Sequence, residues 1–142
     1  MQPKRKVSTL VPYLVRENDI LVYLQKRDKD AKRLPDYFGF FGGGSENDEN
    51  PQQTLLREIK EELNFIPEGF SHFKQYEFES SIRDIFILEV DDNFENKIQV
   101  LEGQYGRWFR EGEVINEQKL SDSDRLALRD IFNFLRLNVK SQ

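Results

Sequence analysis

The sequence predicts a single α/β (α+β) domain that spans residues 1–142. Two amphipathic stretches with helical periodicity support this prediction, one over residues 51–63 and one over residues 122–138. Stretches rich in β-branched and aromatic residues precede the first of these helices and lie between the two, and they are typical of strands. A chain of 142 residues is long enough for one hydrophobic core of ordinary size and too short for two.

The chain opens with a predicted β-hairpin. Lys6–Val15 is rich in β-branched and apolar residues and predicts a strand. Asn18 and Asp19 predict a turn, and Ile20–Leu24 predicts the returning strand. Pro12 has no N–H to donate to a neighbouring strand, so we expect it to mark an edge or a bulge.

A charged segment and a glycine-rich segment follow the hairpin. Gln25–Arg33 carries many charges of both signs, which is typical of a solvated loop. Leu34–Gly44 contains a turn, an aromatic run and three consecutive glycines. Because glycine has no Cβ, this run permits a close approach between the backbone and a ligand.

The helix over residues 51–63 has clear start and stop signals. Asn50 is a good N-cap, Pro51 suits the first helical position, and Gln53 can complete a reciprocal capping interaction. Asn64 can end the helix, because Asn readily adopts the left-handed conformation. The predicted apolar stripe consists of Leu55, Leu56, Ile59 and Leu63.

Three carboxylates gather on this helix beside the apolar stripe. Glu58, Glu61 and Glu62 share one sector, since residues three and four apart are neighbours on a helix. Clustered carboxylates repel one another unless a cation lies among them, and Mg²⁺ prefers oxygen ligands. On the helix alone, a solvated acidic face is the simpler interpretation.

Two further strands and a second helix complete the domain. After a turn at Pro67–Gly69, Phe73–Phe78 and Ile82–Val90 predict two antiparallel strands. Ser121 is placed to cap a helix over Asp122–Asn138. The apolar side of this helix consists of Leu126, Ile131, Phe132 and Leu135.

Composition limits the chemistry of the chain. The chain has no Cys and a single His, which excludes disulfides and thiolate sites and argues against histidine-bound zinc. A net charge of −5 argues against stable nucleic-acid binding, which needs a basic surface. The basic N-terminus precedes no apolar segment, and no stretch approaches the length of a membrane span. We therefore expect a soluble cytoplasmic protein that makes no membrane contact.

The acidic helix belongs to a longer spaced pattern, which resembles the signature box of the Nudix hydrolase family. The box requires Gly, five residues, Glu, seven residues, Arg-Glu, a bulky apolar residue, any residue, Glu-Glu, any residue, Gly and another bulky apolar residue. The matching residues are Gly43, Glu49, Arg57, Glu58, Ile59, Glu61, Glu62 and Phe65. Asn64 replaces the second glycine of the box, and Phe65 is aromatic where an aliphatic residue is usual. Neither change removes a carboxylate.

The resemblance implies a Nudix fold, in which a mixed sheet is sandwiched between helices. It also implies hydrolase activity that depends on Mg²⁺, with Mn²⁺ as an alternative ion. The implied metal ligands are the carbonyl of Gly42 and the carboxylates of Glu58, Glu61, Glu62 and Glu102. The general base stays open among Glu58, Glu61 and Glu102, because a carboxylate that binds a metal tightly is a poorer base.

Glu102 enters this set through a second resemblance. Leu101–Phe109 is similar to a segment of MutT-like family members in which a Glu-Gly-Gln sequence carries a metal-associated catalytic glutamate on a mobile loop. Glu-Gly-Gln alone is a weak signal, because any acidic loop can supply it. The family box also implies that Arg57 pairs with Glu49 and so fixes the loop that carries Gly42 and Gly43.

The resemblance further implies contacts with the substrate. The predicted strand that leads to Lys26 and Arg27 would place Arg27, with Lys26 beside it, on the substrate phosphates, a contact that suits a guanidinium. Phe40 is a candidate for stacking on a base, with simple core packing as the alternative. Asp122 and Asp124 are candidates for base contacts, although the helix dipole also accounts for acidic residues in a first turn.

Together these features predict Mg²⁺-dependent hydrolysis of a nucleoside diphosphate linked to another group. A nucleoside triphosphate cleaved to monophosphate and pyrophosphate is the leading substrate. ADP-ribose, a nucleotide sugar and a dinucleoside polyphosphate remain alternatives, because no motif decides among them. A nucleotide-binding Nudix module without turnover and a plain interaction protein with an acidic helix are the alternatives from other classes. A monomer and a homodimer are both compatible with the sequence.

Overall fold

The computed structural model describes residues 3–139, so the expected domain of residues 1–142 extends beyond the described residues at both ends. Within this range the strands are β1 (Arg5–Arg16), β2 (Asp19–Lys26), β3 (Phe38–Gly39), β4 (Phe41–Gly44), β5 (Ser71–Glu77), β6 (Ser81–Glu89) and β7 (Tyr105–Arg110). The helices are α1 (Pro51–Leu63), α2 (Phe94–Lys97), α3 (Glu111–Asn116) and α4 (Asp122–Val139).

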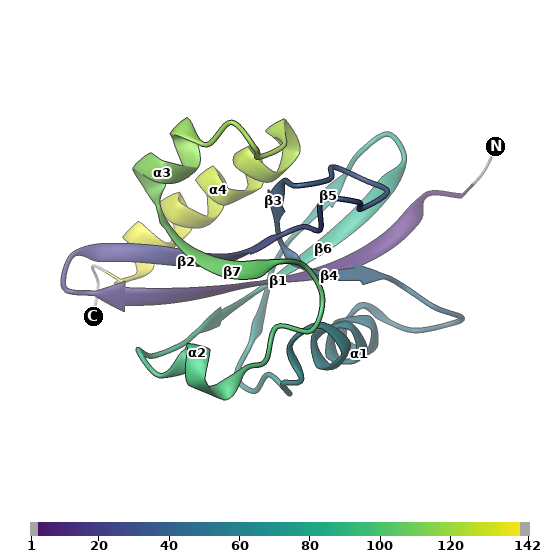
Figure 1. The fold of residues 1–142 in the computed structure, drawn as a ribbon, viewed down its shortest axis with the longest axis horizontal. Coiled ribbons are helices and arrows are strands. Elements are labelled where there is room, and N and C mark those ends of the chain that lie inside the picture. The colour runs from purple at the N-terminus through teal and green to yellow at the C-terminus, as the bar shows by residue number, and fades with distance from the viewer. Residues whose placement is uncertain (1–2, 140–142) are drawn as a thin grey trace.

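All seven strands of the described chain form one mixed sheet. Its main path runs β3-β2-β1-β6-β5, while β4 pairs with β1 and β7 pairs with β2. β1 and β6 are parallel, and the other paired strands are antiparallel. Figure 1 shows α3 and α4 on one side of the sheet and α1 and α2 on the other. The predicted α/β class, with a mixed sheet between helices, is confirmed.

Both predicted hairpins are present, with one correction. β1 pairs with β2, and β5 pairs with β6, each antiparallel. Pro12, however, lies in the central strand β1, opposite Leu88 of β6, and neither at an edge nor at a bulge. On its other side, β1 pairs with β4 as far as Leu10 and with β2 from Tyr13 onward. Pro12 falls in the gap between these two partners, where a missing N–H costs no hydrogen bond.

The sheet separates two hydrophobic cores. The core under α4 includes Ile131, Phe132 and Leu135, whereas Leu126 is 43% exposed. The core under α1 includes Leu55, Ile59 and Leu63, whereas Leu56 is 38% exposed. The sequence pattern places both of these leucines on the apolar sides of their helices, and the structure shows that this prediction is wrong. At 100° per residue, Leu126 lies on the opposite side of α4 from the buried stripe and Leu56 lies beyond the edge of its stripe.

The ends of α1 are closed as predicted, and this fixes where the helix presents its carboxylates. Asn50 Oδ1 accepts a hydrogen bond of 2.9 Å from the Gln53 N–H, and Gln53 Oε1 accepts one of 2.9 Å from the Asn50 N–H. Asn64 adopts the left-handed conformation, with φ 50° and ψ 46°. At the start of α4, Ser121 Oγ accepts from the Asp124 N–H at 3.2 Å.

Among the described residues, no helix is both long and apolar enough to span a membrane.

Candidate active site

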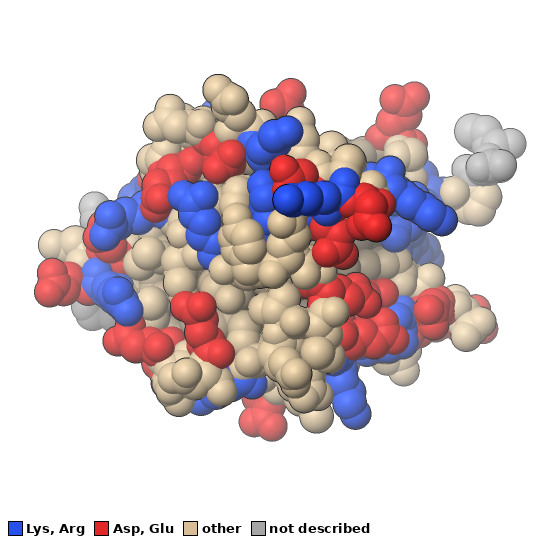
Figure 2. All heavy atoms as spheres, in the orientation of Figure 1, with Lys and Arg blue, Asp and Glu red and all other residues tan. Residues whose placement is uncertain are grey.

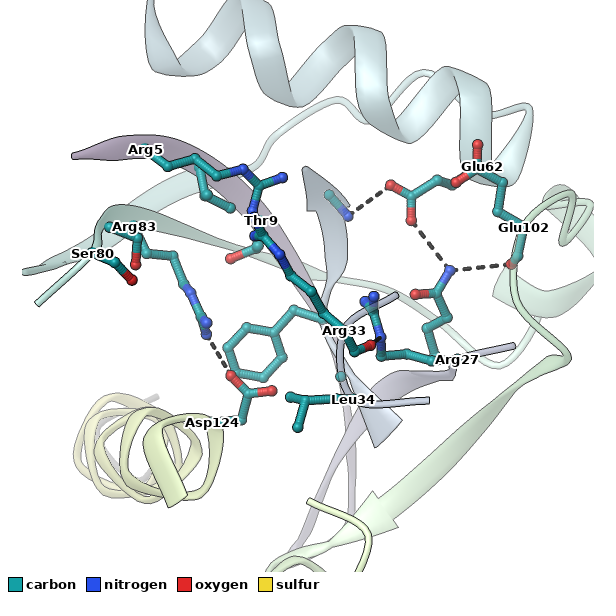
Figure 3. A pocket seen from close by; sticks show the side chains of 16 residues that line it. Arg5, Thr9, Arg27, Arg33, Leu34, Glu62, Ser80, Arg83, Glu102 and Asp124 are labelled. Carbon is teal, nitrogen blue, oxygen red and sulfur yellow. Dashed lines mark hydrogen bonds and ion pairs between the residues drawn. The ribbon is translucent and has the colours of Figure 1, made fainter. Parts of the chain in front are cut away.

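A cavity of about 600 Å³ opens beside β1, β2 and β4, and its walls also come from α1, β6 and α4. This volume suits a nucleotide-sized ligand. Figure 3 shows Glu62 and Glu102 at one side of the cavity and Arg5, Ser80 and Arg83 at the other. In the space-filling view, acidic side chains gather over α1, and basic side chains lie with acidic ones among them on the surface above it (Figure 2). The cavity is therefore polarised along its length.

Glu62 anchors the acidic end, where it is 2% exposed. Its Oε2 accepts from the Gly42 N–H at 3.0 Å, and its Oε1 accepts from Gln25 Nε2 at 3.2 Å. Gln25 Nε2 also donates to the Glu102 carbonyl at 3.1 Å. These bonds hold α1, β2 and β4 together with the loop before β7, which lies far from them in the sequence.

The carboxylates at this end of the cavity repel one another. Burial, reinforced by the carboxylates of Glu58 and Glu102, raises the pKa of Glu62 to about 9, against the opposing effect of the Gly42 N–H. Burial also raises the pKa of Glu102, with Glu58 and Glu61 adding to the shift. Shifts in this direction mean that negative charge is crowded here beyond what the nearby donors offset.

Two glycines of β4 allow this crowding. A Cβ on Gly42, whose φ is 133°, would lie 2.1 Å from the Ser8 carbonyl oxygen of β1. A Cβ on Gly43 would lie 2.7 Å from the carboxyl group of Glu58. At Gly42 and Gly43, β4 thus approaches β1 and the Glu58 carboxylate with no side chain of its own between them. The glycine run predicts a close approach of its backbone to a ligand. In the structure, this backbone closely approaches the backbone of β1 and the side chain of Glu58.

Arg57 clamps the loop between β4 and α1. Its Nε donates to Glu49 Oε2 at 2.8 Å and its Nη2 donates to Glu49 Oε1 at 3.0 Å, a bidentate pair. Nη2 also donates to the Gly44 carbonyl at 2.9 Å, and Nη1 donates to Glu58 Oε1 at 3.1 Å. The hydrogen bonds from Arg57 lower the pKa of Glu49 to about 2. The pairing of Arg57 with Glu49, implied by the resemblance, is present.

The donor set is compatible with a hard divalent cation, although no metal site is preformed. Within residues 3–139, no group of three His, Cys, Asp or Glu side chains is arranged to hold a metal ion. The nearby groups are carboxylates, which are the oxygen ligands that Mg²⁺ and Mn²⁺ accept. The raised pKa of Glu62 is the mark of a site where added positive charge would be stabilising.

The structure brings only some of the predicted residues to the cavity wall. Gly42, Glu62 and Glu102 line the acidic end, and Arg27, Phe40 and Asp124 line the remainder. Phe40 is also part of the core under α4, so both interpretations of this residue apply. Asp124 is 5% exposed, and its Oδ1 lies 2.5 Å from Arg83 Nη1.

Four other residues predicted to contact the metal or the substrate do not line the cavity. Glu58 lies beside Gly43, and Glu61 is exposed, with its carboxylate 3.5 Å from Arg57 Nη1. Lys26 donates to the Asp36 carbonyl at 2.6 Å, because alternation along β2 turns it away from the side on which Gln25 lies. Asp122 is exposed beside a separate hollow between α3 and α4, since residues two apart point to opposite sides of a helix.

The structure adds four residues that the sequence patterns did not identify. Arg5, Thr9, Arg33 and Arg83 all line the cavity. Arg83 is a charged residue within the largely apolar stretch of β6, and this was a readable signal that its side chain has a polar environment. Thr9 and Arg5 gave no such signal. They belong to β1, and the sequence alone does not show which of its side chains face the cavity until the strands that pair with β1 are known.

Comparison with known proteins agrees with this geometry. The family model of the NUDIX domain matches residues 4–131. The chain is 30% identical to the 8-oxo-dGTP diphosphatase of Escherichia coli (strain K12) over 96 residues, which cover 67% of this chain and 74% of that protein.

Solved structures show the same fold. A mutT/nudix family protein from Listeria innocua superposes with a TM-score of 0.77 at 16% identity, covering 100% of both chains. The NUDIX domain of Shewanella oneidensis NrtR, in complex with ADP ribose, superposes with a TM-score of 0.73 at 14% identity, covering 95% of this chain and 90% of that one. The box residues, the fold and the match over residues 4–131 lead to one conclusion: the chain belongs to the Nudix family.

Proposed function

We propose that this protein is a divalent-metal-dependent pyrophosphohydrolase that cleaves the diphosphate bond of a nucleoside diphosphate derivative. The leading substrate is a nucleoside triphosphate, cleaved to the monophosphate and pyrophosphate. One observation carries the proposal: Glu62 of the box and Glu102 of a distant loop meet, with Glu58 nearby, at one end of a nucleotide-sized cavity.

The reaction requires a water oxygen to form a bond to one phosphorus while the bridging P–O bond breaks. The leaving phosphate departs with the bonding electron pair, and the attacking water loses a proton to a base. Glu58, Glu61 and Glu102 are the candidates for that base. Glu102 combines a raised pKa with a place on the cavity wall, which favours it among the three.

The residues that would hold the metal are Glu58, Glu61, Glu62, Glu102 and the Gly42 carbonyl. When bound there, Mg²⁺ or Mn²⁺ supplies charge neutralisation on the phosphates and lowers the pKa of water. Arg27 is proposed to contact the phosphates, and Phe40 and Asp124 are proposed to contact the base. These three side chains line the cavity away from Glu62.

The relatives bear on the substrate without deciding it. An 8-oxo-dGTP diphosphatase as a relative favours a purine nucleoside triphosphate. A structural neighbour in complex with ADP ribose keeps a nucleoside diphosphate joined to a sugar as an alternative in the same fold. ADP-ribose, nucleotide sugars and dinucleoside polyphosphates therefore belong in the first assay.

The test is product analysis with a panel of nucleoside triphosphates, including 8-oxo-dGTP, and with ADP-ribose, nucleotide sugars and dinucleoside polyphosphates. Each compound is incubated with the protein and Mg²⁺, and in parallel with EDTA, and the products are separated by ion-exchange chromatography. We expect Mg²⁺-dependent cleavage of a diphosphate bond in one class. Binding of nucleotides without cleavage of any compound would refute the enzymatic proposal in favour of a binding module.

A further inference from the structure

The end of the cavity opposite Glu62 is built from cationic and hydroxyl side chains. Arg5 and Arg83 lie there with Ser80, and Arg33 extends toward Thr9 between the two ends (Figure 3). The Arg5 guanidinium folds over β4, where its Nη2 lies 3.1 Å from the position that a Cβ on Gly44 would occupy. Arg5 is thereby held next to the segment that carries Gly42 and Gly43.

The positive charge of the arginines around the cavity is only partly neutralised by carboxylates of the protein. Arg83 is paired with Asp124 at 2.5 Å. In the described part of the chain, no carboxylate oxygen lies within 4.0 Å of the guanidinium nitrogens of Arg5, Arg27 or Arg33. A chain with a net charge of −5 thus leaves three guanidinium groups without a carboxylate partner around one cavity.

Arg5 lies close enough to the other arginines of the cavity for its positive charge to be disfavoured. Burial, with added repulsion from Arg33, Arg27 and Arg83, lowers the pKa of Arg5, while the Glu58 carboxylate acts in the opposite direction. Like charges held together in this way are stabilised by an anion placed among them.

An uncharged donor in the same cavity also lacks a partner. Thr9 is 6% exposed, and its Oγ1 is buried without a hydrogen-bond partner among the described residues. Thr9 lines the cavity next to the arginines. A buried hydroxyl without a partner carries an energetic cost, which a ligand that accepts its hydrogen bond would remove. This orphaned group is independent of the charge argument and points to the same ligand.

We propose that the substrate is a nucleoside diphosphate derivative that carries a further phosphate monoester on its nucleotide, and that Arg5 and Arg33 bind this second phosphate. The proposal rests on the proposed hydrolysis of a diphosphate bond, because the scissile diphosphate is placed at the Glu62 and Glu102 end with Arg27, and it favours such a doubly phosphorylated derivative over a nucleoside triphosphate as the substrate. A guanidinium binds a phosphate through two parallel N–H donors, and Thr9 can donate a further bond. A substrate with only one anionic group would leave the far arginines unpaired.

The test compares matched ligands that differ by one phosphate. The first pair is ADP-ribose and ADP-ribose 2′-phosphate, and the second is dephospho-coenzyme A and coenzyme A, which adds a 3′-phosphate. Dissociation constants are measured by calorimetry in EDTA, and turnover is measured separately with Mg²⁺. We expect the added phosphate in at least one pair to tighten binding about tenfold, the equivalent of about 1.4 kcal/mol.

Variants assign this gain to the arginines. Arg5→Gln and Arg33→Gln should each remove most of the tenfold preference while changing the affinity for the unphosphorylated ligand less than about twofold. Lys6→Gln and Lys32→Gln remove the same charge from the neighbouring residues, which do not line the cavity, and should keep the preference. All four side chains belong to exposed residues, so the substitutions leave the core intact.

Failure of this inference is distinguishable from failure of the proposed function. Equal affinity within both pairs, or equal losses for both members of a pair in the arginine variants, would overturn the second phosphate site even if the enzyme hydrolyses diphosphates. Selective binding of the phosphorylated member without turnover of any compound would support the phosphate site and refute the hydrolase assignment.

Discussion

Glu62 shows how a single residue ties the fold to its chemistry. It is an i, i+4 neighbour of Glu58 on α1, yet it is almost fully buried and accepts hydrogen bonds from β4 and β2. Burying a carboxylate beside other carboxylates costs free energy. A buried carboxylate also cannot belong to a solvated acidic face. The simpler interpretation of the acidic helix is therefore wrong for Glu62, while it describes exposed Glu61 well.

Gly43 controls the position of the Glu58 carboxylate. We expect Gly43→Ala to displace this carboxylate, because the added Cβ would lie 2.7 Å from it, and to lower turnover by about 10- to 100-fold without unfolding the protein. Gly112→Ala is the matched control, since a Cβ at Gly112 meets no atom within 4 Å. Steady-state kinetics and thermal melting check both variants. Equal turnover in the two would show that the position of Glu58 is unimportant.

Glu102→Gln tests whether the loop carboxylate takes part in the reaction. The substitution keeps the backbone contact between Gln25 and the Glu102 carbonyl, and it removes the negative charge and the basicity of the side chain. We expect kcat to fall by about 100-fold or more, with a much smaller change in KM. An unchanged kcat would return Glu102 to the status of an ordinary loop residue.

At the scale of elements, α1 depends on a narrow apolar stripe. Leu55 is fully buried and its neighbour Leu56 is 38% exposed. We expect Leu55→Ala to lower the free energy of unfolding by about 2–5 kcal/mol, because it leaves a cavity under the helix. Leu56→Ala should change it by no more than about 0.5 kcal/mol. Urea denaturation distinguishes the two, and similar losses would contradict the observed orientation of α1.

The clamp between Arg57 and Glu49 predicts a dependence of stability on pH. Because the pKa of Glu49 is lowered to about 2 from an ordinary value of 4.5, its contribution is fully present above pH 4.5 and is lost as the pH falls toward 2. The difference in melting temperature between the wild type and Glu49→Gln should therefore be largest above pH 4.5 and shrink below it. Glu68→Gln, an exposed substitution outside the clamp, serves as the control. A difference that stays constant down to pH 3 would contradict this account.

Local signals were sufficient to predict the longer elements β1, β2, α1, β5, β6 and α4, whereas the short elements β3, β4, α2 and α3 and the strand β7 were not predicted from them. The caps of α1, both hairpins and the extent of α4 follow from residues that lie close together in the sequence. Pro12 was misjudged because the gap between β4 and β2 depends on which strands pair with β1, and no local pattern contains that information. Leu56 and Leu126 were misjudged because each helix buries a narrower side than its apolar content suggests.

For the whole molecule, the sequence predicted one half of the cavity better than the other. The acidic end is encoded in a contiguous box and one loop, so spacing and resemblance identified Glu62 and Glu102. The cationic end is assembled from β1, β6 and the loop before β3, which meet only because β1 and β6 pair in parallel. Arg5, Thr9 and Arg83 could not be grouped without that pairing.

The most direct test compares turnover of the wild type and Glu62→Gln, with Mg²⁺ or EDTA, on whichever substrate the panel identifies. We expect the wild type to be active with Mg²⁺ and inactive with EDTA. Glu62→Gln should lose at least about 100-fold in turnover while its melting temperature stays close to that of the wild type, because the amide replaces the carboxylate without leaving a cavity. Turnover that survives EDTA, or a folded Glu62→Gln variant with near-normal activity, would contradict the assignment of this cavity as a metal-dependent hydrolase site.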